Sequence, residues 1–358
     1  MKKNNLLLFL WVLLSWPVGA QYYNNAFGLN GAPLKTALHD IIKNHTVITY
    51  ADLWTAFQQT DTKPDGTVWD IYTDVPGGNP VIVFQFVTDQ CGNYSAEGDC
   101  YNREHTWPKE KFGGDNAYPM YADLHHIYPT DGWVNNKRAA YPYGMVSNVS
   151  YTSLSNASKL GTGNTYAAYN DKIFEPIDSF KGDLARTYFY MSTRYENEDA
   201  GWDNWTMANG AQLTADAITL LLNWHHQDPV SQKELDRNNA VATIQHNRNP
   251  FIDYPAFADC IWGSADCSAS TLRESEMLCK LNLFPNPATH FISLRLQAAT
   301  IQSWTVYNVY GQQQGHHVSA TPYPNEVTVD IENYRAGNYM ICLQTSAGFV
   351  KKIFSKAD

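Results

Sequence analysis

The sequence predicts an α+β protein of two domains, and three observations support this fold class. Apolar residues recur every three or four positions in several segments before residue 262, which is helical spacing. After residue 281 the spacing changes to short alternating segments, which is typical of strands. With 358 residues, 14% of them aromatic and only 17% charged, the chain is long and apolar enough for two cores.

Residues 1–20 predict an export signal. Lys2 and Lys3 form a basic start, residues 6–16 form an apolar run too short to span a bilayer comfortably, and small residues precede Gln21. No later stretch of the sequence is long and apolar enough for a transmembrane helix. We therefore expect an exported chain with no integral membrane segment once the signal is removed.

The first domain is expected over residues 21–262. Its spacing of apolar residues predicts five helices, over residues 33–45, 50–59, 181–195, 214–226 and 231–245. The apolar run at residues 80–87 predicts a buried strand. Residues 88–180 are dense in Asn, Gly, Tyr and Pro, so we expect loops that contain most of the polar chemistry.

A linker is expected over residues 263–280, because this stretch is small, polar and rich in Ser. The second domain, residues 281–358, is expected to be a small all-β sandwich. Alternating residues separated by turn signals predict its strands, over residues 291–296, 303–308, 326–331 and 338–344.

The six cysteines can form disulfides in an exported chain. Cys91–Cys100 brackets a short loop rich in Gly, Asn and Ser, which suits a local bridge. Cys260–Cys267 is expected to form a second bridge. The pairing of Cys279 and Cys342 stays open, because they lie far apart in the sequence.

The net charge of −10 disfavours a broadly basic surface for nucleic acid, because phosphate contacts normally come from Lys and Arg. A site for nucleic acid in this chain therefore needs a local basic patch, or a metal ion that supplies positive charge.

Side chains suited to phosphodiester hydrolysis gather at residues 102–108, 123–126 and 131–138, where a carboxylate, imidazoles, amides and arginines occur together. This reaction needs an activated water and charge neutralisation in the transition state. An imidazole can deprotonate the water. A divalent cation held by a carboxylate and an amide oxygen can neutralise the phosphate and the leaving group.

These segments, REHTWP at 103–108, DLHH at 123–126 and VNNKR at 134–138, resemble the bacterial endonuclease I family. The resemblance covers roughly residues 30–262, with further motifs at residues 174–176, 181–191 and 228–253. It implies a ββα-metal finger (His-Me finger) nuclease core with surrounding helices.

The resemblance also implies roles for individual residues. His105 would be the general base, and Glu104 and Asn135 would bind a divalent metal, Mg²⁺ first, with Ca²⁺ or Mn²⁺ as alternatives. Asn136 is the alternative second ligand, one position further along the chain. Catalytic contacts to phosphate are expected from two arginines, Arg138 and Arg186.

Other side chains near the motif have less defined roles. Some members of the family carry a further catalytic arginine after the Glu-His pair, whereas residues 109–121 of this chain contain none. Lys109 or Lys111 would take its place, or the role would fall to another arginine. Arg103 receives no role beyond phosphate or structural pairing. The aromatic residues between 118 and 143 are expected mainly to fill the core, with base stacking as the alternative.

Residues 283–288 (LFPNPA), the Gly-Asn-Tyr at 337–339 and the closing Lys-Lys-Ile at 351–353 resemble the C-terminal sorting domain of type IX secretion substrates. A carbohydrate-binding or adhesive sandwich is the alternative. The resemblance implies export to the cell surface or beyond, with the type IX secretion machinery as a partner.

Together these features predict a secreted, metal-dependent endonuclease that hydrolyses DNA, RNA or both with little sequence specificity. We expect it to act as a monomer. A non-catalytic surface protein that retains the nuclease fold and binds a polymer is the alternative, and a phosphodiesterase for small nucleotides or lipids is a third possibility.

Overall fold

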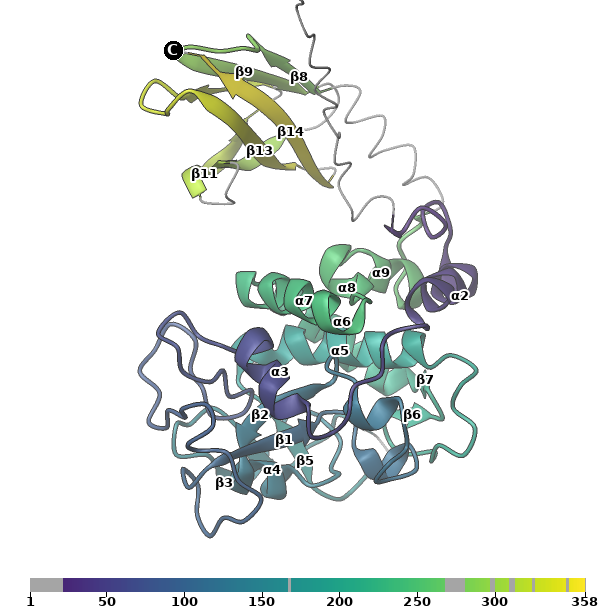
Figure 1. The fold of residues 1–358 in the computed structure, drawn as a ribbon. Coiled ribbons are helices and arrows are strands. Elements are labelled where there is room, and N and C mark those ends of the chain that lie inside the picture. Colours follow the sequence, from purple (N-terminus) through teal and green to yellow (C-terminus); the bar gives the residue numbers. More distant parts are fainter. Residues whose placement is uncertain are drawn as a thin grey trace, which may run out of the picture. The chain divides into compact units, whose positions relative to one another are not determined.

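The computed structural model describes residues 22–357, apart from 167–168, 268–280, 297–299, 309–312, 324–325 and 346–347. The expected signal, residues 1–20, and most of the expected linker lie outside these residues. The described residues form two compact units, one ending at Ala265 and the other beginning at Asp266 (Figure 1).

The helices predicted for the first unit are all present, with bounds that differ by a few residues. They are α2 (Gly31–Ile42), α3 (Leu53–Thr60), α5 (Lys181–Arg194), α6 (Ala215–Gln227) and α7 (Gln232–Gln245). Two short helices follow, α8 (Pro250–Asp253) and α9 (Phe257–Trp262). None of the described helices has the length and apolar character needed to cross a membrane.

A ββα unit forms the middle of the first unit. β1 (Tyr101–His105) pairs antiparallel with β2 (Ile127–Asp131), and this register places Glu104 opposite Tyr128. α4 (Gly132–Arg138) follows β2 without a loop and packs on both strands. Asp131 ends β2 and also caps α4, because its Oδ1 accepts a hydrogen bond from the Val134 amide at 2.9 Å.

The β1–β2 ribbon lies between α4 and α5 (Figure 1). On the α5 side, the Tyr128 and Thr187 hydroxyls are 2.7 Å apart, and the Tyr188 hydroxyl donates to the Thr106 carbonyl at 2.8 Å. Every residue of α5 is buried, so this helix is the centre of the unit.

Short elements complete the first unit. β3 (Asn148–Thr152), β4 (Lys159–Thr162) and β5 (Ile173–Glu175) form one small sheet, and β6 (Ala208–Asn209) pairs with β7 (Gln212–Leu213). Three 3₁₀ turns occur at η1 (Lys109–Lys111), η2 (Met120–Ala122) and η3 (Asp178–Phe180).

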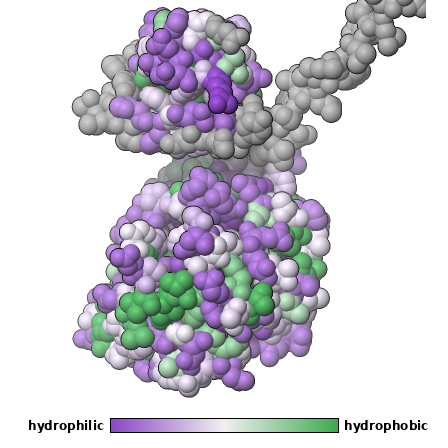
Figure 2. Space-filling model, turned by 60° about the vertical axis from the view of Figure 1, so that its left-hand side comes forward, coloured by the Kyte–Doolittle hydropathy of each residue, from purple (hydrophilic) through white to green (hydrophobic). Residues whose placement is uncertain are grey.

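The strand predicted over residues 80–87 is wrong. Phe84 is buried at 3% exposure, but Val81, Val83 and Val87 are 68%, 48% and 64% exposed. The segment buries alternate side chains against the core near α3 and α7, yet it forms no strand ladder with another described segment. One face is therefore covered and the other is open. Figure 2 shows hydrophobic side chains gathered on one face of this unit.

The second unit is the predicted β-sandwich. Its strands are β8 (Leu281–Phe284), β9 (Phe291–Leu296), β10 (Ile301–Asn308), β11 (Gln313–Tyr323), β12 (Glu326–Asp330), β13 (Gly337–Thr345) and β14 (Gly348–Lys356). One sheet has the order β12-β9-β8 and the other β11-β10-β13-β14. Side chains from both sheets share one core, including Leu294, Val329, Ile341 and Leu343.

Three of these strands, β8, β11 and β14, were not predicted. β11 and β14 contain the pairs His316-His317 and Lys351-Lys352, which break the alternation of polar and apolar residues. β8 is only 4 residues long.

The cysteines form two local bridges, as far as the described residues show. Cys91–Cys100 is a disulfide, and Cys260 and Cys267 are both disulfide-bonded. Cys342 is free and buried. Cys279 lies outside the described residues.

Candidate active site

The end of β1 and the middle of α4 line a pocket of about 420 Å³. The pocket brings together four of the five residues that the sequence predicted for the site: Glu104, His105, Asn135 and Arg138. The fifth, Arg186, does not line it.

Glu104 places its carboxylate at a buried edge of this pocket, with 3% of the residue exposed. Its Oε1 accepts hydrogen bonds from the Tyr72 hydroxyl at 2.6 Å and from Arg138 Nη1 at 2.9 Å. Burial raises the pKa of Glu104 to about 7, although Arg138 and Tyr72 favour the charged form. Its Oε2 accepts no hydrogen bond from the described residues.

His105 lies at the end of β1 with its ring in an aromatic stack. The ring planes of Tyr121 and Tyr50 are inclined to it by 17° and 16°, with centroids 5.2 and 5.7 Å away. Its Nε2 is 3.2 Å from the Tyr121 carbonyl oxygen. A carbonyl can only accept, so Nε2 carries the proton and Nδ1 has the free lone pair. Burial, with a smaller effect from His126, holds the pKa of His105 well below its usual range.

Asn135 is tied to the same strand. Its Nδ2 donates to the carbonyl of Arg103, the residue before Glu104, at 3.4 Å. The amide oxygen Oδ1 has no hydrogen-bond donor among the described residues. Asn136 lines the pocket too, but its side chain is exposed and has no such tie to β1. Of the two amides, only that of Asn135 is therefore held by β1 beside Glu104.

Glu104 and Asn135 offer a donor set that fits a hard divalent cation. Glu104 Oε2 and Asn135 Oδ1 are oxygen atoms on the lining of one pocket, and neither has a protein donor in the described part of the chain. Mg²⁺ typically takes one or two protein oxygens and keeps several waters. The described residues contain no group of three or more His, Cys, Asp or Glu that could hold a metal ion.

Arg138 holds this arrangement together. It is 1% exposed, and Nη1 donates both to Glu104 and to the His105 carbonyl, each at 2.9 Å. Nη2 donates to the Thr106 carbonyl at 2.5 Å. Both terminal nitrogens are thus bonded to the protein, and Arg138 orients Glu104 and fixes the chain that follows it.

Arg186 lies away from the pocket, on the buried helix α5, and is 0% exposed. Its Nε and Nη2 donate to the two carboxylate oxygens of Glu234 at 2.5 and 2.8 Å, and Nη1 donates to the Asp228 carbonyl at 2.9 Å. The expectation of a phosphate contact from Arg186 is corrected, because its guanidinium is enclosed and joins α5 to α7.

Sequence reasoning gave Arg103 no role beyond phosphate or structural pairing, and this residue lines the pocket. Its guanidinium lies over the ring of Tyr50 at 3.7 Å and near that of Trp54 at 4.2 Å, and Nη1 donates to the Tyr50 carbonyl at 2.9 Å. Its position next to Glu104 on the strand was the only available signal. Lys109 also lines the pocket, paired with Asp115 at 2.5 Å.

Lys111, the alternative to Lys109, does not line the pocket, and its Nζ lies 3.9 Å from Asp203.

The histidine pair His125-His126 supports the fold. His126 bonds to the Met120 carbonyl at 2.7 Å, with its ring centroid 5.5 Å from that of His105. His125 packs instead on Tyr190, at 4.4 Å.

Known families match both units. A profile described as Endonuclease I matches residues 30–256, and one described as Secretion system C-terminal sorting domain matches residues 282–356. The chain is 36% identical over 248 residues to an extracellular ribonuclease of Bacillus amyloliquefaciens, covering 67% of this chain and 78% of the relative. It is 34% identical, with the same coverage, to an extracellular ribonuclease of Bacillus subtilis (strain 168).

A more distant relative is an extracellular deoxyribonuclease of Aeromonas hydrophila, 26% identical over 140 residues, which are 39% of this chain and 52% of the relative. The matched residues 30–256 include the whole pocket, and the sorting profile covers the β-sandwich. The chain therefore belongs to the endonuclease I family, as an exported enzyme whose nuclease unit is followed by a secretion sorting domain.

Proposed function

We propose that the pocket hydrolyses phosphodiester bonds of RNA and DNA outside the cell, with little sequence specificity. One observation carries this proposal. The imidazole of His105, whose Nε2 faces a carbonyl, lines the same pocket as Glu104 and Asn135, each of which has a side-chain oxygen that accepts no hydrogen bond from the described residues. A base and a cation site in one pocket are what the reaction requires.

His105 is the proposed general base. Its Nδ1 takes a proton from the attacking water, and the Tyr121 carbonyl stabilises the ring through Nε2–H. Burial holds the pKa of His105 low and so keeps the imidazole neutral before the transfer. A bound phosphate adds negative charge nearby, which favours the protonated ring after the transfer.

Glu104 and Asn135 are the proposed ligands of a divalent cation, Mg²⁺ first. When bound, the cation supplies positive charge to the phosphate and to the leaving oxygen. Arg138 keeps Glu104 in place, while Arg103 and Lys109 add positive charge at the pocket wall. This local charge matters because the whole chain carries a net charge of −10.

The proposed substrates are both RNA and DNA, because these residues act on the phosphodiester and none of the proposed steps uses the 2′-hydroxyl. The names of the relatives, ribonucleases and a deoxyribonuclease, support both. We also propose a monomer, since Glu104, His105 and Asn135 all come from one ββα unit and the site needs no second chain.

A digestion panel of single- and double-stranded RNA and DNA, with Mg²⁺, Ca²⁺ or Mn²⁺, tests the proposal. Cleavage is expected to need a divalent ion and to stop with EDTA. His105→Ala should lose at least ~100-fold in rate, the scale for removing a general base. The matched control is His226→Ala, because His226 is an exposed histidine on α6 that pairs with Asp259.

A His105→Ala enzyme with full activity would contradict the mechanism. If the unmodified chain cuts no nucleic acid with any of the metals, a polymer-binding protein that retains the nuclease fold becomes the better explanation.

A further inference from the structure

The disulfide loop before β1 forms part of the wall of the active-site pocket. Tyr94, in the middle of the loop closed by Cys91–Cys100, lines the pocket with Asn135 and is half-buried. Its ring packs directly on the backbone where α4 begins. A Cβ atom added at Gly132 would lie 2.4 Å from Tyr94 Cδ1, so only glycine leaves room for this ring.

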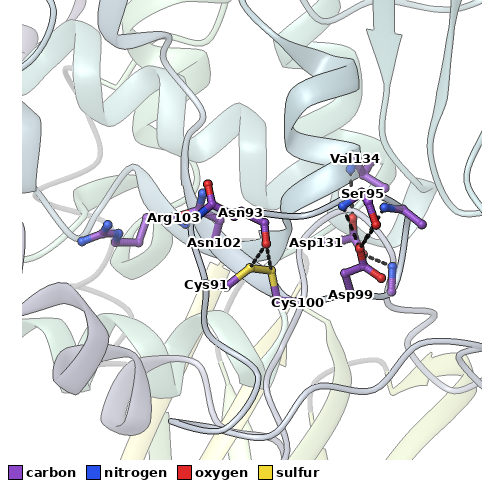
Figure 3. Close-up of a disulfide and its surroundings, with 11 residues drawn as sticks. Cys91, Asn93, Ser95, Asp99, Cys100, Asn102, Arg103, Asp131 and Val134 are labelled. Carbon is purple, nitrogen blue, oxygen red and sulfur yellow. Dashed lines mark hydrogen bonds between the residues drawn. A yellow bond between two sulfur atoms is a disulfide. The ribbon is translucent and has the colours of Figure 1, made fainter.

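The loop has an internal framework besides its disulfide (Figure 3). Asp99 Oδ2 accepts hydrogen bonds from the Ser95 and Ala96 amides at 2.7 and 2.9 Å. These amides belong to the two residues that follow Tyr94 in the chain. The backbone that carries the tyrosine is therefore fixed on both sides, by the disulfide and by this carboxylate.

The loop is also joined to the finger helix. The Gly98 amide donates to Asp131 Oδ2 at 2.6 Å, while Oδ1 of the same carboxylate caps α4. The Gly132 amide donates to the Cys100 carbonyl at 2.9 Å. The loop and the start of α4 thus hold Tyr94 in a fixed position relative to Asn135.

Of the two tyrosines in the pocket, Tyr94 is the one whose ring is not covered by another aromatic or cationic side chain of the described residues. Two tyrosines line the pocket, Tyr50 and Tyr94. The ring of Tyr50 is covered by the Arg103 guanidinium at 3.7 Å and by Tyr121 at 4.3 Å. The ring of Tyr94 has no aromatic or cationic neighbour among the described residues, and its hydroxyl has no hydrogen-bond partner there.

We propose that Tyr94 stacks on a base of the substrate next to the cleaved phosphate, and that the enzyme therefore prefers unpaired strands. This inference rests on the proposed nuclease function. Every base has a π face, so stacking binds single strands without reading their sequence. In a duplex that face is covered by neighbouring bases, and exposing it costs a few kcal/mol.

The test compares oligonucleotides with one cleavable phosphate, all other linkages being phosphorothioate. One substrate carries both flanking bases, and the other is abasic on both sides of the cleaved bond. Tyr94→Ala in the full chain should lower kcat/KM on the base-bearing strand by roughly 5- to 150-fold, the range for losing one base–aromatic stack. Its effect on the abasic strand should be much smaller, because the partner of the ring is already missing.

The comparison remains informative if Tyr94→Ala is partly unfolded, because one enzyme preparation is used on both substrates. Tyr94→Phe retains the ring and should retain activity. Tyr169→Ala is the matched control, since Tyr169 is a half-buried tyrosine of the same unit outside the pocket. The ratio of single-strand to duplex cleavage should fall in Tyr94→Ala and stay unchanged in the control.

Equal losses on the base-bearing and abasic strands would overturn the stacking role. A loss in Tyr94→Phe as large as in Tyr94→Ala would do the same, because it assigns the effect to the hydroxyl. If the unmodified enzyme cleaves neither strand nor bis(p-nitrophenyl) phosphate, it is the nuclease function that fails.

Discussion

Replacing Arg186 by Met should destabilise the nuclease unit without removing its chemistry. The substitution deletes two charge-assisted hydrogen bonds to Glu234, at 2.5 and 2.8 Å, and one to the Asp228 carbonyl, at 2.9 Å. Glu234 is 3% exposed, so its carboxylate would be left buried without a cation in contact. Removing one partner of a buried ion pair costs about 3–5 kcal/mol of the free energy of unfolding.

The protonation of Glu234 gives this prediction a pH signature. Burial and the nearby Asp183 already raise the pKa of Glu234 to about 7, and Arg186 opposes that rise. Without Arg186 the folded-state pKa rises further, so the added loss of stability is largest at high pH. It is smallest near the unfolded-state pKa of about 4.3, where the buried carboxyl is protonated.

Urea unfolding of Arg186→Met at about pH 5 and pH 8, followed by tryptophan fluorescence, measures both effects. Adding Glu234→Gln should recover part of the stability at pH 8, because the unpaired charge is then absent. Cleavage by the folded variant at low temperature should stay within a few-fold of the parent. A loss of cleavage beyond ~100-fold with unchanged stability would refute this reasoning and assign Arg186 to the chemistry.

Three further predictions concern the finger and its loop. Asn135→Ala should weaken the apparent affinity for Mg²⁺ by at least ~10-fold, whereas Asn136→Ala should not, and metal titration of the cleavage rate separates them. Burial and the neighbouring charge of Asp70 raise the pKa of Asp131 to about 7, above the unfolded value of ~3.9. The stability that the protonated Asp131 contributes to the fold is therefore lost as the pH rises through 7. The melting temperature of Asp131→Asn should therefore vary less with pH than that of the parent. Replacing both cysteines of Cys91–Cys100 by Ser should lower kcat/KM on single strands as Tyr94→Ala does. A thiol assay should confirm the variant's composition. Parental activity in this variant would show that the bridge does not hold the loop.

The parts of the fold that repeat a local pattern could be predicted from the sequence. Helical spacing predicted five of the helices of the first unit, α2, α3, α5, α6 and α7, and Ser231 with Glu234 forms the capping box that begins α7. The segment at residues 80–87 shows the limit of this reasoning. Its apolar run predicted a buried strand, but only alternate side chains are covered, and no sequence pattern states whether a partner strand lies beside the segment.

The site could be predicted only where one motif carries it. Glu104, His105 and Asn135 lie on one ββα unit, which the resemblance of its motifs to a known family had indicated. Arg186 occurs in an equally suggestive motif, yet its partners, Glu234 and Asp228, come from tertiary contacts that a single sequence does not display. The same holds for Tyr72, whose hydroxyl reaches Glu104 from a loop 32 residues away.

Helix α5 has a consequence for how the nuclease unit opens. All 14 of its residues are buried, and four of them are Lys, Asp or Arg side chains whose partners lie on other elements. No side of the helix can be exposed to water without separating those partners. Its amide protons should therefore exchange with solvent only when the unit unfolds as a whole, so that α5 reports global stability while the surface loops report local motion.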